Sequence, residues 1–538
     1  MTEQLQETLN EIARARGAVL NLQNGRLEAS LGGRTISLQL PSDAKGVDAL
    51  SDLPSALPSR AARGDIREKT LYNIVQDMIG LAEGSRLSDS TLQAQLPKIL
   101  RADPASRRVL ASVMARQYWF RPKGSSPTTF LSPFHADLPG AYEYNGRYKS
   151  FRGSLLLFLS FDGTGFDLSL AEDILEFMRS DVGLNPLDRE LLHAARKVAE
   201  QSGQRRKPNA SRLVELDNEQ PRRDAQIQSR LRDGAFDQVA IDRIRRDLRT
   251  VMTLELPRHD KVAALVLALS LHIALHYYRV AFAIGEGLDA AARALDGHRT
   301  RQQPSFSGAV LFRVGSGGDR PVRHTDPCST AWWRLDEQHL LALPANMISA
   351  NLLHTVTTAV LGDDAPHRPD PHACAIALER EPNALALAEL LCCAVAAKLT
   401  ELSGDVPSSY DPGAGGYALR SAALETFRGR TSALKQRGRD VVNTMVGGFG
   451  GTLKRNRGKV RFFELDEQVL FLLVKLILDG AGVEQMPLQT EFLPALSQYG
   501  LAPQDSAEEE LLADALQRLG LLDRYSDAGE ATYVRHII

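Results

Sequence analysis

The sequence predicts a mainly helical α+β protein of several domains. Apolar residues recur at helical spacing over residues 65–118, 167–200, 236–295 and 336–402. Short alternating runs near the N-terminus, an apolar run at Ala309–Val314 and two short runs at the C-terminus predict strands. At roughly 100–200 residues per domain, a chain of 538 residues corresponds to about three or four domains.

The N-terminal region predicts one helix followed by a small β-meander. Residues 2–16 place Leu5, Leu9 and Ile12 on one helical face. Three alternating runs follow, and Asn24-Gly25 and Gly32-Gly33 between them supply the positive φ of tight hairpin turns. The runs are Ala18–Leu22, Arg26–Leu31 and Thr35–Leu40.

Two segments without periodicity divide the rest of the chain. Residues 201–225 are polar and contain Pro208 and Pro221, and 404–416 contain six glycines or prolines in thirteen positions. The apolar run Ser154–Phe161 predicts a buried strand. The predicted units are 1–64 (helix and meander), 65–200 (helical with a buried strand), 201–225 (linker), 226–403 (mainly helical), 404–465 (flexible joint and basic glycine-rich segment) and 466–538.

Composition and cysteine usage indicate in which cellular compartment the protein is expected. The longest apolar stretch, Val262–Ala283, is interrupted by His272, His276 and Arg279, so we expect a buried helix and no membrane span. The N-terminus is acidic and polar, unlike a secretory signal. The four cysteines form no C-x-x-C pair and no disulfide framework, which favours a reducing cytoplasm.

The C-terminal residues 466–538 predict a winged helix. Three helices are expected, and a hairpin follows them around Ser526–Gly529. Ser506 and Glu509 stand at the spacing of a capping box. The helices are Glu467–Leu478, Thr490–Tyr499 (starting near Phe492 because of Pro494) and Ser506–Leu519, and the strands are Leu521–Tyr525 and Ala531–Ile537.

The third of these helices has the wrong charge for a DNA-reading helix. Glu508, Glu509, Glu510 and Asp514 oppose only Arg518, a net charge of −3. A helix in the major groove should not repel phosphates, so the sequence favours protein interaction by this helix over DNA binding.

A basic segment precedes the winged helix. Residues 428–463 hold ten basic residues and one acidic residue, a net charge of +9 in a chain of net charge −2. Gly447–Gly451 lie in its middle, and Phe449, Phe462 and Phe463 would stack on bases if exposed. Three interpretations stay open, namely nucleic-acid contact, an acidic protein partner, or a solvated loop leading into a strand, Lys459–Phe463, whose phenylalanines pack in the core. The candidate contact residues are Lys435, Arg437, Arg439, Lys454, Arg455, Arg457, Lys459 and Arg461.

No complete catalytic motif is present. Neither glycine-rich segment, 315–320 or 447–451, matches the P-loop pattern, and no G-x-S-x-G surrounds a serine. The pair His272 and His276 lacks the glutamate and third ligand of a zinc helix, and the prolines in 366–374 favour an ordinary loop over a metal site. We therefore expect no enzyme activity, catalytic residue, metal or cofactor. For Trp332-Trp333, a core or domain-interface position is the default expectation.

The last ninety or so residues resemble the DptG family, an accessory component of phosphorothioation-dependent DNA restriction. The resembling residues are Gly450-Gly451, Lys454–Arg461, Phe463–Glu467 leading into Val469–Leu478, Phe492-Leu493, Tyr499-Gly500, Leu519–Leu522, Ser526–Ala531 and Tyr533–Arg535. Similar proteins occur in methylation-associated anti-phage systems. The resemblance implies an accessory subunit that acts beside a HerA-like or other motor ATPase, and no catalytic residues.

Together these expectations describe a non-catalytic subunit of an anti-phage defence complex, bridging DNA and a motor or nuclease partner. Two alternatives remain. One is a free-standing winged-helix DNA-binding regulator, and the other is a diverged nuclease whose active-site residues are scattered along the sequence.

Overall fold

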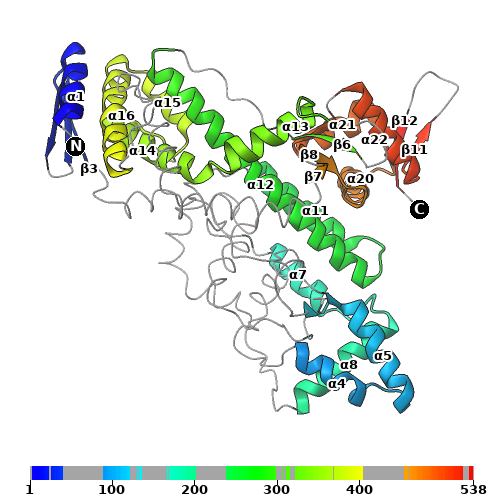
Figure 1. The fold of residues 1–538 in the computed structure, drawn as a ribbon. Helices are drawn as coiled ribbons and strands as arrows, with labels where there is room; N and C mark the ends of the chain where they lie inside the picture. Colours follow the sequence, from blue (N-terminus) through cyan, green and yellow to red (C-terminus); the bar gives the residue numbers. More distant parts are fainter. Residues whose placement is uncertain are drawn as a thin grey trace.

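The computed structural model describes residues 3–23, 26–39, 89–120, 169–201, 238–298, 310–314, 322–367, 369–403, 454–457, 460–503, 505–524 and 532–536, with single positions at 130–131, 134–135, 138, 167 and 306. These residues form many helices and a few small sheets (Figure 1). The predicted class, mainly helical with small β elements, is confirmed. The predicted strand Ser154–Phe161 and the joint 404–416 lie outside the described residues, as does most of the linker 201–225.

The N-terminal helix and meander are confirmed. They are α1 (Glu3–Ala15), β1 (Val19–Gln23), β2 (Arg26–Leu31) and β3 (Arg34–Gln39), in one antiparallel sheet ordered β1-β2-β3. Gly32 and Gly33 have φ of 59° and 82°, the left-handed conformation that a tight β2–β3 turn requires. This unit lies beside α16 (Pro382–Ser403) in Figure 1, where Arg34 pairs with Glu381 at 2.9 Å.

Helices make up most of the described part of 89–201. They are α4 (Asp89–Ile99), α5 (Pro104–Tyr118), α7 (Ser169–Arg179) and α8 (Pro186–Gln201), with the short strands β4 (Trp119–Phe120) and β5 (Phe130–Leu131). Asp103 begins α5, because its carboxylate accepts hydrogen bonds from the backbone N–H groups of Ala105 and Ser106. A buried bond of 2.5 Å from the Tyr118 hydroxyl to Asp188 ties α5 to α8.

The central part is the helix pair α11 (Gln238–Thr253) and α12 (Arg258–Leu295). Among the residues that the structure describes, two segments have the length and hydropathy of membrane spans, α12 itself and Pro382–Leu399 of α16. The structure buries 88% and 67% of those windows, which is typical of core helices. After α12 come β6 (Val310–Val314), α13 (Pro327–Trp332), the π-helical η3 (Trp333–Leu340), α14 (Leu343–Leu361), η4 (Gly362–Asp364), α15 (Pro371–Glu379) and α16.

The C-terminal part contains the three predicted helices and the hairpin. Its elements are β7 (Lys454–Arg457), β8 (Val460–Leu465), α20 (Glu467–Ala481), β9 (Gln485–Pro487), η7 (Leu488–Phe492), α21 (Leu493–Gln498), β10 (Leu501–Pro503), α22 (Ser506–Arg518), β11 (Leu522–Arg524) and β12 (Thr532–Arg535). The predicted capping box at Ser506 is wrong. Asp505 caps α22 instead, accepting from the Glu508 N–H at 3.0 Å.

Two sheets organise this C-terminal part. The hairpin β11–β12 is extended by β9 in the order β11-β12-β9. The other sheet is ordered β10-β6-β8-β7 and places β6 parallel to both β10 and β8. Strand β6 comes from residues 310–314, so the sheet joins segments that the predicted domain boundaries separate.

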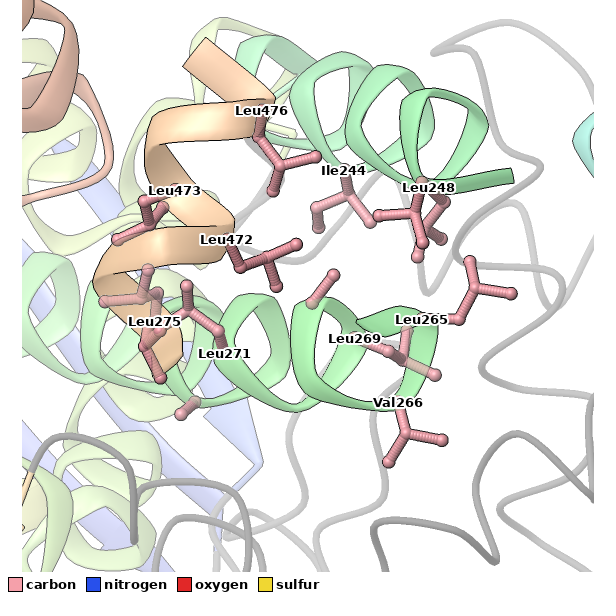
Figure 2. Close-up of a cluster of buried hydrophobic side chains, with 14 of the residues drawn as sticks. Ile244, Leu248, Leu265, Val266, Leu269, Leu271, Leu275, Leu472, Leu473 and Leu476 are labelled. Carbon is pink, nitrogen blue, oxygen red and sulfur yellow. The ribbon is translucent and has the colours of Figure 1, made fainter. Parts of the chain in front are cut away.

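A shared hydrophobic core crosses the same boundaries. Figure 2 shows side chains of α20 between those of α11 and α12, with Leu472 and Leu476 facing Ile244 and Leu271 nearby. All four are almost completely inaccessible to solvent. Burying each such side chain contributes roughly 1.5–3 kcal/mol. The C-terminal part is therefore held against the central helices by its first helix.

Candidate nucleic-acid interface

The structure brings four of the eight predicted contact residues into one β-hairpin. Lys454, Arg455 and Arg457 lie on β7, and Arg461 lies on β8. The register pairs Lys454 with Phe463 and Arg457 with Val460. The other candidates, Lys435, Arg437, Arg439 and Lys459, and Phe449 with them, lie outside the described residues. We call β7–β8 the basic hairpin.

Two phenylalanines anchor the basic hairpin. Phe462 and Phe463 are both buried, and the Phe463 ring packs edge-on against Tyr278 of α12 at 5.6 Å. The condition for stacking on bases, an exposed ring, is therefore not met at Phe462 and Phe463, and the alternative that these rings pack in the core is confirmed. Strand β7 is the last strand in the order β10-β6-β8-β7, so its basic residues occupy one edge of a sheet whose interior is fixed.

Arg461 is held at the surface beside α13 and η3. Its guanidinium lies 5.3 Å from the centroid of the Trp332 ring, and its Nη1 lies 3.7 Å from Oε1 of Glu337. The Ser329 hydroxyl donates to the Arg461 carbonyl at 2.8 Å. The side chain remains about half exposed, so a phosphate can replace the weak carboxylate contact.

A second arginine group, which sequence reasoning missed, lies on α11. Arg245, Arg246 and Arg249 line an open groove of about 450 Å³ with three other residues of the same helical face. Their charge is largely compensated, because Arg245 lies 3.5 Å from Asp242 and Arg249 lies 2.7 Å from Asp173. The sequence run R-I-R-R-D-L-R at 243–249 could have indicated this arginine group, but a solvent-exposed helix face has the same pattern. The other lining residues are Asp242, Thr250 and Thr253.

His272, the first histidine of the pair considered for a zinc helix, belongs to a buried polar network. The Nε2 of His272 lies 2.9 Å from Oδ2 of Asp247, and the Tyr499 hydroxyl donates to the same oxygen at 2.8 Å. All three side chains are buried. Burial and the nearby Asp247 carboxylate raise the pKa of Tyr499 well above its ordinary value. This network joins α11, α12 and the residue that follows α21.

The segment 366–374 was expected to be an ordinary loop, but its residues from Pro371 onward belong to helix α15. Asp370 caps α15 by accepting hydrogen bonds from the N–H groups of His372 and Ala373 at 2.9 and 3.2 Å. Within the described part of the chain, no three His, Cys, Asp or Glu residues are grouped so as to hold a metal ion.

Helix α22 presents an acidic outer surface. Glu510 and Asp514 are exposed one turn apart, whereas Leu512 and Leu516 are buried on the opposite side. Arg518 pairs with Glu467 of α20 at 3.0 Å, so its charge is already engaged. This surface repels a phosphate backbone and suits a basic partner surface.

No family model matches the chain, and no curated protein matches its sequence. Three features of geometry and charge define the candidate interface. Those features are a basic hairpin at a sheet edge, an arginine-lined groove on α11 and an acidic helix α22.

Proposed function

We propose that the chain is a non-catalytic, cytoplasmic subunit of a bacterial anti-phage defence complex, bridging DNA and a motor or nuclease partner. The observation that carries this proposal is the basic hairpin. Four basic residues lie on two paired strands at a sheet edge, and buried Phe462 and Phe463 fix the base of the hairpin. Arginine and lysine at such an edge contact phosphates without reading sequence.

The partner is proposed to dock on the C-terminal part. Its order of α20, β9, α21, α22 and the β11–β12 hairpin, with β12 between β11 and β9, supports a winged helix. Its acidic helix α22 supports protein docking by that winged helix. The resemblance of the last ninety residues to the DptG family suggests a HerA-like or other motor ATPase as the partner. In that complex the hairpin holds DNA while the winged helix holds the motor.

A free-standing winged-helix DNA-binding regulator is the second candidate. The strand order β11-β12-β9 favours it, because DNA-binding winged helices share this topology. The exposed Glu510 and Asp514 on α22 argue against it, since the corresponding helix of a regulator enters the major groove. A regulator would bind one duplex sequence far more tightly than unrelated ones, whereas backbone contact by the hairpin would not discriminate.

The decisive experiment replaces Lys454, Arg455, Arg457 and Lys459 together with alanine. If these residues contact the DNA backbone, binding to unrelated duplexes weakens about equally. The slope of log K against log salt then falls by about 0.9 per lost contact, or about three to four units in all. The matched control removes the same charge from exposed positions on α5 and α8, namely Arg108, Arg116, Arg189 and Lys197.

Two other outcomes contradict DNA contact by the hairpin. Unchanged DNA titration with loss of co-purification with the motor subunit identifies the hairpin as a protein-docking element. No change in either assay, with stability altered by less than about 0.5 kcal/mol, identifies a solvated surface strand.

A further inference from the structure

Trp333 stands out from the other tryptophans of the chain. The chain has three, and Trp119 and Trp332 are 6% and 8% exposed. Trp333 is 53% exposed at the start of η3. Leaving a large indole in water forgoes burial energy and needs an explanation, because such residues are enriched at binding sites. Its neighbourhood supplies one.

Two residues that flank Trp333 in the chain, Trp332 and Glu337, contact Arg461 of the basic hairpin. Glu337 follows Trp333 by four residues, about one turn later in η3, and lies 3.7 Å from Arg461. Trp332, its chain neighbour, lies 5.3 Å beneath the Arg461 guanidinium. Arg461 therefore contacts one residue before Trp333 in the chain and one residue after it. From these flanking contacts we infer that the exposed Trp333 indole and the half-exposed Arg461 side chain lie on one surface patch.

The next residue adds a second cation that is fixed in place. Arg334 pairs with Glu286 of α12, and its guanidinium lies 5.3 Å from the centroid of the Phe282 ring. About half of its side chain remains exposed. The patch thus offers an aromatic face with a basic group on the same helix and another from β8.

We propose that this patch binds single-stranded nucleic acid, with an unpaired base stacked on Trp333 and the adjoining phosphates near Arg461 and the basic hairpin. Stacking on an exposed aromatic ring needs a free base face, which a duplex hides between its neighbours. The basic hairpin alone favours any phosphate chain, and Trp333 adds the preference for an unpaired strand. This inference rests on the proposed function, since it assigns a substrate class to the same interface.

The test uses the full-length protein, a thymidine oligonucleotide and a duplex of equal length. Because Trp333 is the exposed one of the three tryptophans, the oligonucleotide should quench intrinsic fluorescence with saturation. Trp333→Ala should weaken oligonucleotide binding about 5- to 100-fold in an anisotropy titration and leave duplex binding unchanged. Trp333→Phe should retain most of the affinity, because the ring still stacks. The control is Val182→Ala, which trims an exposed apolar residue outside the patch.

Three results overturn the inference. Wild-type oligonucleotide binding by Trp333→Ala shows that no base stacks there. Equal losses on oligonucleotide and duplex show that Trp333 supports the interface generally. Intact DNA binding with lost co-purification of a partner makes the indole a protein contact. None of these removes the dependence of DNA binding on the basic hairpin, so failure of the proposed function would be seen separately in the fourfold alanine variant.

Discussion

The hydroxyl of Tyr499 donates a hydrogen bond of 2.8 Å to the carboxylate of Asp247, although 252 residues separate the two in the chain. The same carboxylate oxygen lies 2.9 Å from Nε2 of His272. One buried oxygen therefore connects α11, α12 and the residue that follows α21. The apolar contacts of Leu472 and Leu476 lie along the same helices (Figure 2). These polar contacts fix the relative orientation of the helices more strictly than apolar packing does, because the Tyr499 hydroxyl and the His272 ring must both reach the same oxygen.

We expect Asp247→Ala to destabilise the whole protein by about 2–5 kcal/mol. The substitution leaves the Tyr499 hydroxyl and the His272 ring buried without their shared acceptor. Asp247→Asn should cost less, because its amide oxygen still accepts from Tyr499. Urea denaturation followed by circular dichroism measures both values.

The control for Asp247 is Asp514→Ala on the exposed surface of α22, which should change stability by less than about 0.5 kcal/mol. If Asp247→Ala matches this control, the network contributes nothing to stability. The C-terminal part would then be held by apolar packing alone.

The protein should lose stability as pH rises above about 10. Burial raises the pKa of four tyrosines, Tyr118, Tyr277, Tyr278 and Tyr499. A nearby carboxylate raises the pKa further at three of them: Asp188 at Tyr118, Asp336 at Tyr278 and Asp247 at Tyr499. Between the ordinary tyrosine pKa of about 10 and the raised values, the unfolded chain binds fewer protons than the folded one. Stability is therefore full below about pH 10 and falls above it, by about 1.4 kcal/mol per pH unit for each tyrosine.

Denaturant titrations at pH 8 and about pH 11 measure this loss, and tyrosinate absorbance should rise together with unfolding. Tyr277→Phe supplies a matched variant, because burial alone raises the pKa of this residue. It should make the decline shallower by about 1.4 kcal/mol per pH unit. An identical slope in wild type and variant would show that Tyr277 ionises freely in the folded state.

Local elements were predictable from the sequence, and long-range pairing was not. The meander follows from alternation and from Gly32-Gly33, and α20 follows from an apolar run that begins after Asp466. The parallel sheet that joins β6 to β8 and β10 was not predicted. Each strand alone is a short apolar run, and no periodic signal says that residues near 310 pair with residues near 464 and 501.

At the candidate site, too, local features were predictable from the sequence and features that depend on long-range packing were not. The clustering of Lys454, Arg455, Arg457 and Arg461 was visible because charge accumulates locally in the sequence. The burial of Phe462 and the exposure of Trp333 depend on packing against distant elements, so neither was decided by its neighbours in the chain. For Trp333 the default expectation, a core or interface position, differs from the exposed side chain observed.

The four cysteines should resist alkylation while the protein is folded. All four are buried, and burial raises the pKa of the Cys374 thiol to about 12 and that of Cys392 well above its ordinary value. At pH 8 very little of the Cys374 thiol is then the reactive thiolate. Iodoacetamide followed by mass spectrometry should show no adduct on native protein and four after denaturation. Fast native labelling of Cys374 would contradict its burial.

Gly500 should be irreplaceable at the start of β10. Its φ is +85°, and a Cβ atom there would lie 2.3 Å from Cε1 of Phe306. Its carbonyl also accepts from the Val310 N–H at 3.0 Å, the bond that begins the pairing with β6. Gly500→Ala therefore combines left-handed strain of about 1–2 kcal/mol with a steric overlap that displaces Phe306 or the strand. We expect a total loss of about 3–5 kcal/mol in thermal or urea denaturation.

Gly482→Ala separates these two causes. Gly482 has φ of +68° at the end of α20, and a Cβ atom there would meet no atom within 4 Å. It should therefore show the left-handed strain alone, about 1–2 kcal/mol. The difference between the two variants measures the overlap with Phe306, and equal losses would mean that Phe306 moves aside without cost. A larger loss at Gly500 would show that close approach of the chain to Phe306 helps to hold β10 against β6.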